Sequence, residues 1–133
     1  MARQTGKNHA PHLVIKRIKG KGRGVFAGRP IAKDEIIERV PMLVIPKKEF
    51  DEHLGSTILY KYCFDWRKDS VALALGYGSL YNHSFGPNAL YEDVGPQLKV
   101  FIALRDIRPG EEITINYNGR PRGRKSVEFS VIP

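Results

Sequence analysis

Residues 76–92 read Gly-Tyr-Gly-Ser-Leu-Tyr-Asn-His-Ser-Phe-Gly-Pro-Asn-Ala-Leu-Tyr-Glu, and this stretch is the most informative part of the chain. It gathers hydroxyl, amide and imidazole side chains among aromatic rings, which few structural needs require. An Asn-rich turn capped by Gly-Pro-Asn is the structural alternative. The density of hydrogen-bonding groups favours a functional site.

Two further segments bracket this stretch. Residues 21–27 upstream read Lys-Gly-Arg-Gly-Val-Phe-Ala, and residues 110–117 downstream read Gly-Glu-Glu-Ile-Thr-Ile-Asn-Tyr. Alone, the upstream segment is typical of a solvated turn between strands, because glycine adopts positive φ without steric cost. The downstream segment alternates apolar and polar residues as a half-buried strand does. Their order and spacing around the central stretch make all three more informative together.

Residues 82–88 resemble the Asn-His-Ser-x-x-Pro-Asn signature of SET-domain protein lysine methyltransferases, which transfer a methyl group from S-adenosylmethionine to a lysine side chain. The upstream segment resembles the first cofactor loop of that family, and the downstream one resembles the segment that ends in its catalytic tyrosine. The similarity spans about residues 13–118 and is greatest to the minimal, stand-alone SET proteins of viruses and bacteria. It implies a SET-domain fold of small curved sheets with a C-terminal pseudoknot and short helices.

The apolar pattern itself predicts a mostly β chain. A helix is expected over residues 47–54, where Phe50 and Leu54 lie four apart, and a second helical piece over 57–64. In the segment 98–103, we expect the face that carries Lys99 to be only partly apolar. The expected strands are 13–18, 25–27, 36–39, 42–45, 71–75, 89–92, 98–103 and 113–117.

The length of 133 residues, with 41% hydrophobic composition, predicts one small domain. We expect a flexible tail over residues 1–12, the SET domain over 13–118 and a basic flank over 119–133. The single cysteine, Cys63, rules out an intrachain disulfide and a zinc site built on four cysteines. The apolar runs are too short for a signal peptide or a membrane span. The expected location is therefore cytoplasmic, or nuclear or nucleoid, and not secreted.

The resemblance assigns roles to individual residues. The backbone at residues 22–25 should contact the methionine part of the cofactor, and the main chain at Asn82 and His83 should lie near the adenine. Phe129 is the aromatic residue available after Tyr117 to cover the adenine. The predicted cofactor-binding residues are Gly22, Arg23, Gly24, Val25, Tyr81, Asn82, His83, Tyr117 and Phe129.

The chemistry of methyl transfer predicts an aromatic channel. The nitrogen, methyl carbon and sulfur must lie in line, which is mainly a positioning task. The amine must also be neutral, although free lysine has a pKa of about 10.4. Desolvation in an apolar channel lowers that pKa, so no strong base and no metal is expected. By resemblance, Tyr117 is the catalytic tyrosine, and Tyr62 and Tyr91 line the channel, where the Tyr91 hydroxyl limits how many methyl groups fit.

Two other reactive side chains are predicted to be structural. An Asn-His pair inside a tight loop favours a hydrogen-bonded role for His83 over a general base, since no acid in the motif is placed to orient it. Cys63 lies in an apolar setting, which raises a thiol pKa and indicates an inert residue. His9 and His12 are interpreted as parts of the tail and not as metal ligands.

The net charge of +8 and the pI near 9.7 favour nucleic-acid binding as an alternative function. Residues 119–125 resemble the Arg-Gly-Arg core of minor-groove AT-hook peptides. A SET-like scaffold without transfer activity is a third hypothesis. A homodimer is also possible, because small stand-alone proteins of this family can pair. The sequence does not name the lysine-bearing protein substrate. A basic substrate requires acids along the groove, for which the candidates are Glu35, Glu38, Asp93, Glu111 and Glu112.

Overall fold

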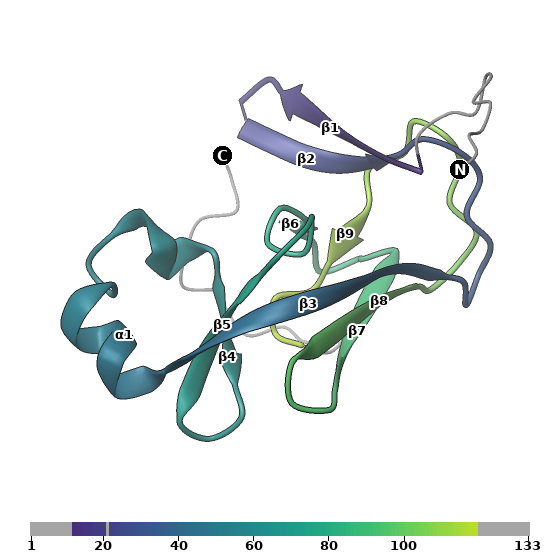
Figure 1. The fold of residues 1–133 in the computed structure, drawn as a ribbon. Helices are drawn as coiled ribbons and strands as arrows, with labels where there is room; N and C mark the ends of the chain where they lie inside the picture. The colour runs from purple at the N-terminus through teal and green to yellow at the C-terminus, as the bar shows by residue number, and fades with distance from the viewer. Residues whose placement is uncertain (1–11, 21, 120–133) are drawn as a thin grey trace, which may run out of the picture.

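The computed structural model describes residues 12–20 and 22–119, which form a mostly β fold (Figure 1). In chain order, the elements of this part are β1 (Leu13–Ile18), β2 (Gly22–Ala27), β3 (Ile36–Pro46), α1 (Lys47–His53), the 3-10 helix η1 (Ile58–Lys61), β4 (Cys63–Trp66), β5 (Ser70–Ala74), β6 (Asn82–His83), β7 (Ala89–Val94), β8 (Leu98–Ala103) and β9 (Thr114–Ile115). The predicted fold class is confirmed.

The largest sheet has the strand order β4-β5-β3-β8-β7, with antiparallel neighbours throughout. β3 is the long strand that crosses the molecule in Figure 1. It pairs with β8 up to Pro41 and with β5 from Met42 onward. Two strands were predicted here, over 36–39 and 42–45, but β3 is one continuous strand because β8 and β5 pair with its successive halves. Pro41, which has no N–H, stands where the strand changes partner. The sheet is therefore two small antiparallel units that share one strand.

Helix α1 confirms the helix predicted over 47–54, and it buries Phe50 against the sheet. The second predicted helical piece is only partly correct. It is limited to the four residues of η1, and Cys63–Trp66 form strand β4 instead. Cross-strand pairing with β5 overrides the local preference, and it places Trp66 in the core with 1% of its surface exposed.

The short strands β6 and β9 bring the two downstream motifs together as a parallel pair, Asn82 beside Thr114 and His83 beside Ile115. The strand predicted over 113–117 is shorter than expected, because the Tyr117 amide donates to a histidine ring and not to a ladder. Glu112 also bridges to Phe26 of β2. The C-terminal motif is thus enclosed by the central stretch and the β1–β2 hairpin.

The core contains the inward face of β8, which carries Lys99 among apolar residues and is nevertheless buried. Lys99, Phe101 and Ala103 are all at most 1% exposed. The long stem of Lys99 packs among aromatic rings, so a residue that reads as polar in the sequence is as buried as its apolar neighbours. None of the helices in this part of the chain has the length and apolarity that a membrane crossing needs.

Candidate functional site

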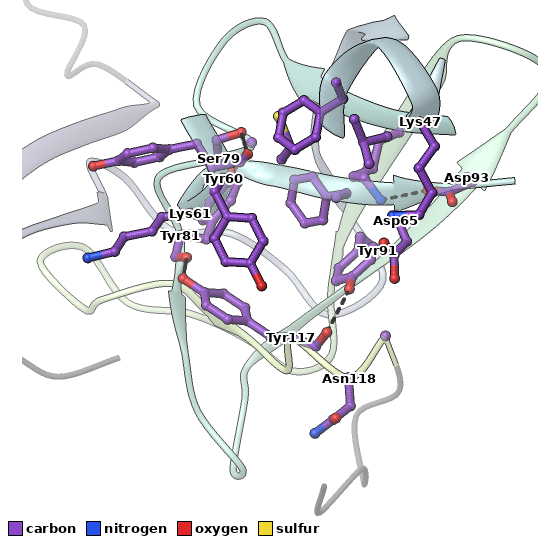
Figure 2. A pocket seen from close by; sticks show the side chains of 18 of the residues that line it. Lys47, Tyr60, Lys61, Asp65, Ser79, Tyr81, Tyr91, Asp93, Tyr117 and Asn118 are labelled. Carbon is purple, nitrogen blue, oxygen red and sulfur yellow. Dashed lines mark hydrogen bonds and ion pairs between the residues drawn. The ribbon is translucent and has the colours of Figure 1, made fainter. Parts of the chain in front are cut away.

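A cavity of about 780 Å³ opens beside the large sheet, between α1, η1, β4, β7 and the segment 117–119. Five tyrosines from different parts of the chain line it: Tyr60, Tyr62, Tyr81, Tyr91 and Tyr117. Figure 2 shows Tyr117 with Tyr91 and Tyr81 as its neighbours. The residues predicted for catalysis and for the channel therefore share one pocket, which we call the tyrosine pocket.

Tyr117 is held in this pocket by hydrogen bonds at its backbone and at its side chain. Its hydroxyl donates to the carbonyl oxygen of Tyr81 at 2.8 Å, and its backbone N–H donates to Nδ1 of His83 at 2.9 Å. Its own carbonyl oxygen accepts a longer bond of 3.5 Å from the Tyr91 hydroxyl. Burial raises the pKa of Tyr117 to about 12, with the nearby Glu112 carboxylate and Tyr62 adding to it. The hydroxyl therefore stays protonated near neutral pH.

Tyr91 comes from β7 and forms a wall of the pocket. Its ring lies edge-on to Phe64 at 5.6 Å and tilted against Phe101 at 5.8 Å, measured between centroids. Burial raises the pKa of the Tyr91 hydroxyl to about 12, with a smaller effect of the Asp93 charge. Tyr62 follows η1, and its carbonyl oxygen accepts a hydrogen bond from the Ser79 hydroxyl at 2.8 Å. The loop before β6 thus fixes the backbone of Tyr62.

Tyr81 connects the pocket to the core of the molecule. Its ring is 1% exposed and packs against Phe101 at 4.7 Å between centroids. Its hydroxyl donates to one carboxylate oxygen of Glu38 at 2.8 Å, and the other oxygen accepts the Tyr77 N–H at 2.9 Å. Burial and the adjacent Glu38 charge raise the pKa of Tyr81. Glu38 therefore anchors the loop that carries the Tyr81 carbonyl to Tyr117.

A second group of predicted residues meets where the first motif contacts the central and C-terminal ones. The Asn82 side-chain amide donates to a Glu112 carboxylate oxygen at 2.7 Å and to the Arg23 carbonyl oxygen at 3.0 Å. A Cβ on Gly24 would lie only 2.6 Å from that Glu112 oxygen. Glycine at position 24 is therefore needed for the close approach of these segments. We call Arg23, Gly24, Asn82, His83 and Glu112 the glycine-loop cluster.

Two other residues of the predicted cofactor loop lie differently. Gly22 has φ +87°, which favours glycine, but no atom lies within 4 Å of a Cβ built there. Val25 is fully buried, and its carbonyl oxygen accepts the Ile113 N–H at 2.8 Å. Val25 is thus a core residue that ties the loop to the C-terminal motif. Phe129 lies outside the described residues.

His83 joins the cluster to the tyrosine pocket. Because its Nδ1 accepts the Tyr117 N–H, the ring proton of the neutral form belongs on Nε2. Nε2 is buried and has no hydrogen-bond partner among the described residues. The ring contacts Phe85 at 4.4 Å and Tyr117 at 5.1 Å between centroids, and burial lowers its pKa. The predicted hydrogen-bonded role is confirmed.

Several residues at the site were not predicted. Asn88, 3% exposed, donates to the Glu112 carbonyl oxygen and accepts the Thr114 N–H, each at 2.8 Å. Asn88 is the last residue of the Asn-His-Ser-x-x-Pro-Asn signature, and this position could have indicated that it belongs to the site. Of the acids expected along the groove, Asp93 lines the pocket, where Asp51 and Asp65 join it. Lys99 also lines the pocket, and no pattern in the sequence indicated it.

The glycine-loop cluster fits the cofactor that the sequence implies. It combines a carboxylate, a side-chain amide and a backbone approached through a glycine without a Cβ. These groups suit a ligand with an ammonium and hydroxyl groups. The buried Nε2 of His83 is a further donor without a protein partner in the described part of the chain. For a metal, residues 12–20 and 22–119 contain no cluster of three His, Cys, Asp or Glu side chains.

The sequence of this chain is similar to a known domain family and to several known proteins. The SET domain profile matches residues 22–118. A Schizosaccharomyces pombe protein named histone-lysine N-methyltransferase, H3 lysine-37 specific, is 38% identical over 79% of this chain and 72% of its own length. The Drosophila melanogaster histone-lysine N-methyltransferase Set8 is 33% identical over 83% of this chain, which spans 18% of that relative's length.

A solved structure also resembles this fold. It comes from Plasmodium falciparum and is described as that of a candidate histone methyltransferase. It has a TM-score of 0.66 and 33% sequence identity, and the match covers 80% of this chain and 92% of the other. The residues matched by the SET domain profile include the glycine-loop cluster and Tyr62, Tyr81, Tyr91 and Tyr117 of the tyrosine pocket.

Proposed function

This chain belongs to the SET-domain family of protein lysine methyltransferases, and on that premise we propose that it methylates a lysine of a histone or of another basic, DNA-associated protein. The observation that carries the proposal is the position of Tyr117. Its hydroxyl lines the tyrosine pocket, and its backbone is bonded to His83 of the glycine-loop cluster. A target lysine in the pocket and a cofactor at the cluster would meet at this residue. The scaffold and DNA-binding alternatives are not favoured by the relatives.

The glycine-loop cluster would hold S-adenosylmethionine, which supplies the methyl group as its sulfonium sulfur becomes a thioether. In this proposal, Asn82, His83 and the backbone at 22–24 bind it, while Tyr81 supports Tyr117. The buried side chain of Val25 contributes shape only. Phe129 remains the residue that the sequence predicts to cover the adenine. The carboxylate of Glu112 joins the predicted set because it contacts Asn82.

The tyrosine pocket would orient and desolvate the target amine. Aromatic rings exclude water, which lowers the pKa of a buried lysine and favours the neutral nucleophile. The Tyr117 hydroxyl donates a hydrogen bond to the Tyr81 carbonyl oxygen, so the hydroxyl oxygen would accept a hydrogen bond from an amine N–H. The lysine ammonium would lose one proton to solvent before the attack, and the attack would give the methylated ammonium and the thioether. His83 takes no part as a base, because its Nδ1 is bonded to the Tyr117 N–H.

The substrate class follows from the relatives and from charge. The fission-yeast relative is named for histone H3, and this chain carries a net charge of +8 that disfavours a basic partner. The tyrosine pocket is lined by Asp51, Asp65 and Asp93 and by as many lysines, Lys47, Lys61 and Lys99, so the pocket itself does not add to this repulsion. A histone substrate implies a nuclear or nucleoid location. DNA contact through residues 119–133 and a homodimer stay predictions from sequence.

The test is transfer of labelled methyl from S-adenosylmethionine to a mixture of histones and other lysine-rich proteins. Wild type is compared with Tyr117→Phe, and mass spectrometry locates and counts the methyl groups. We expect lysine methylation by wild type and a loss of at least about a hundredfold in the variant, since misplacing a reacting group costs about that much. Tyr77→Phe is the matched control, because Tyr77 is 37% exposed and lies outside the pocket.

Cofactor binding by calorimetry on the same sample separates the remaining outcomes. Binding without transfer to any protein in the mixture contradicts the proposed substrate class and leaves the cofactor site standing. If the protein shows no cofactor binding and no transfer, the whole proposal is contradicted, and the scaffold hypothesis is favoured instead.

A further inference from the structure

Lys99 is buried in the wall of the tyrosine pocket, with 1% of its side chain exposed. In the described part of the chain, no other charged residue is buried to this degree. Its ammonium lies 2.6 Å from Asp93, whose side chain is 30% exposed. Burying an ammonium is costly unless it is paired, so this position demands a physical reason.

The surroundings of the Lys99 ammonium form an aromatic box. Its Nζ lies 4.1 Å from the ring centroid of Tyr91, 4.2 Å from that of Phe64 and 5.4 Å from that of Trp66. Cation–π attraction of this kind strengthens when the cation is desolvated. Burial lowers the pKa of Lys99, while the hydrogen bond and charge of Asp93 oppose that shift. The carboxylate therefore favours the charged form that the rings attract.

Tyr91 is the member of this box that faces the reaction. Its ring lines the pocket, and its hydroxyl is 3.5 Å from the carbonyl oxygen of Tyr117. Phe64, Phe101 and Lys99 all contact this ring. Figure 2 shows Tyr91 between Asp93 and Tyr117, with the dashed ion pair of Asp93 above it. The ring of Tyr91 is therefore held at a fixed distance from Tyr117.

We propose that the Lys99–Asp93 pair is a positioning element that holds Tyr91 in place and thereby limits how many methyl groups the tyrosine pocket accepts on its target amine. This inference rests on the proposed function, because it takes the pocket as the place where the target lysine binds. Each added methyl group enlarges the amine, and a ring that cannot tilt leaves no room for it. Both residues line the pocket, and the proposed effect of the pair passes through the Tyr91 ring that Lys99 contacts.

The test replaces the pair by neutral side chains of similar size, Lys99→Met with Asp93→Asn. Removing both partners leaves no unpaired buried charge, so we expect the variant to fold. The readout is kcat/KM on synthetic peptides of the wild-type target site that carry an unmodified, a monomethylated or a dimethylated lysine. Arg105→Met with Glu111→Gln is the matched control. That pair also lies at 2.6 Å, but its side chains are 54% and 28% exposed and do not line the pocket.

We expect the double variant to raise kcat/KM for methylated relative to unmodified peptide by about fivefold, the factor that a cation–π contact of about 1 kcal/mol corresponds to. Faster flipping of the Tyr91 ring, measured by NMR, should accompany this change. The control pair should keep the wild-type preference. If the double variant does not fold, Lys99→Met alone leaves only the partly exposed Asp93 carboxylate, at 30%, without its partner, and it should shift the preference in the same direction.

An unchanged preference in the folded double variant, with wild type active, overturns this inference and leaves the proposed function intact. A wild type that methylates no peptide and no protein overturns both. A shift that the exposed control pair reproduces equally also overturns the inference, because the change would then come from net charge.

Discussion

The hydroxyl of Tyr117 donates its hydrogen bond to the carbonyl oxygen of Tyr81, at 2.8 Å. Tyr81 is the residue directly before the Asn-His pair, so this bond fixes the tyrosine of the last motif to the backbone of the central one. Since the proton of the hydroxyl points at a carbonyl, its oxygen must serve as acceptor toward an amine. The orientation of the predicted catalytic group is thus set by the main chain.

The pH dependence of methyl transfer should reflect the substrate and not Tyr117. Burial raises the pKa of Tyr117 to about 12, so the hydroxyl stays protonated through pH 10. The rate should rise with pH as the target lysine, with a free pKa of about 10.4, loses its proton. The pH–rate profile of wild type measures this, and tyrosinate absorbance of wild type minus Tyr117→Phe gives the pKa. A Tyr117 titration below pH 10 would contradict the assignment.

Substitution of Asn88 should destabilise the C-terminal motif. Its side chain satisfies the Glu112 carbonyl and the Thr114 N–H, each at 2.8 Å, in a setting where it is 3% exposed. Asn88→Ala leaves both groups without this partner and should cost about 2–4 kcal/mol of unfolding free energy. Asn88→Asp keeps an acceptor for Thr114, but only its protonated form can donate to the Glu112 carbonyl, so this variant should lose less stability in acid than above neutral pH. Urea unfolding checks both, and equal losses would show that hydrogen bonding is not the cause.

The two glycines of the first motif should respond differently to alanine. At Gly24, a Cβ would lie 2.6 Å from a Glu112 oxygen and 3.0 Å from the Asn82 amide. Gly24→Ala should displace that pair and weaken S-adenosylmethionine binding by at least about tenfold, as one extra methyl group in a fitted site does. At Gly22, with φ +87° and no neighbour, alanine should cost about 1 kcal/mol of stability with little change in affinity.

Calorimetry with S-adenosylmethionine and denaturant unfolding of both glycine variants separate these effects. If Gly22→Ala weakens the affinity as much as Gly24→Ala does, backbone conformation and not close approach controls the cofactor loop.

Stability should fall in mild acid because of His83. Burial lowers its pKa below the value of about 6.5 in the unfolded chain, so the unfolded state binds more protons between the two values. The contribution of His83 is therefore present above pH 6.5 and is lost as the pH falls through the folded value. Protonation of Nδ1 would also break the bond from Tyr117. Urea midpoints from pH 8 to 5 should decline less in His83→Gln, and parallel declines would rule this origin out.

Much of the fold was readable because strand and turn signals are local. The boundaries of β1 and β8 were predicted to the residue, and α1 to within one. Misses occurred where a distant partner decides the conformation. β4 is a strand because β5 pairs with it, and β3 is continuous because two strands share it. Such pairing energies have no local signature.

The sequence by itself determined the family, through three motifs whose residue types and spacing are rarely needed for structure alone. It also predicted that Tyr62, Tyr91 and Tyr117 share one site and that His83 is hydrogen-bonded, and the structure shows both. Only the tertiary structure decided that Glu112 meets Asn82, and that Lys99 lies buried behind Tyr91. A charged residue reads as exposed in a sequence, because the partners that offset its desolvation, here Asp93 and the surrounding rings, are brought to it only by folding.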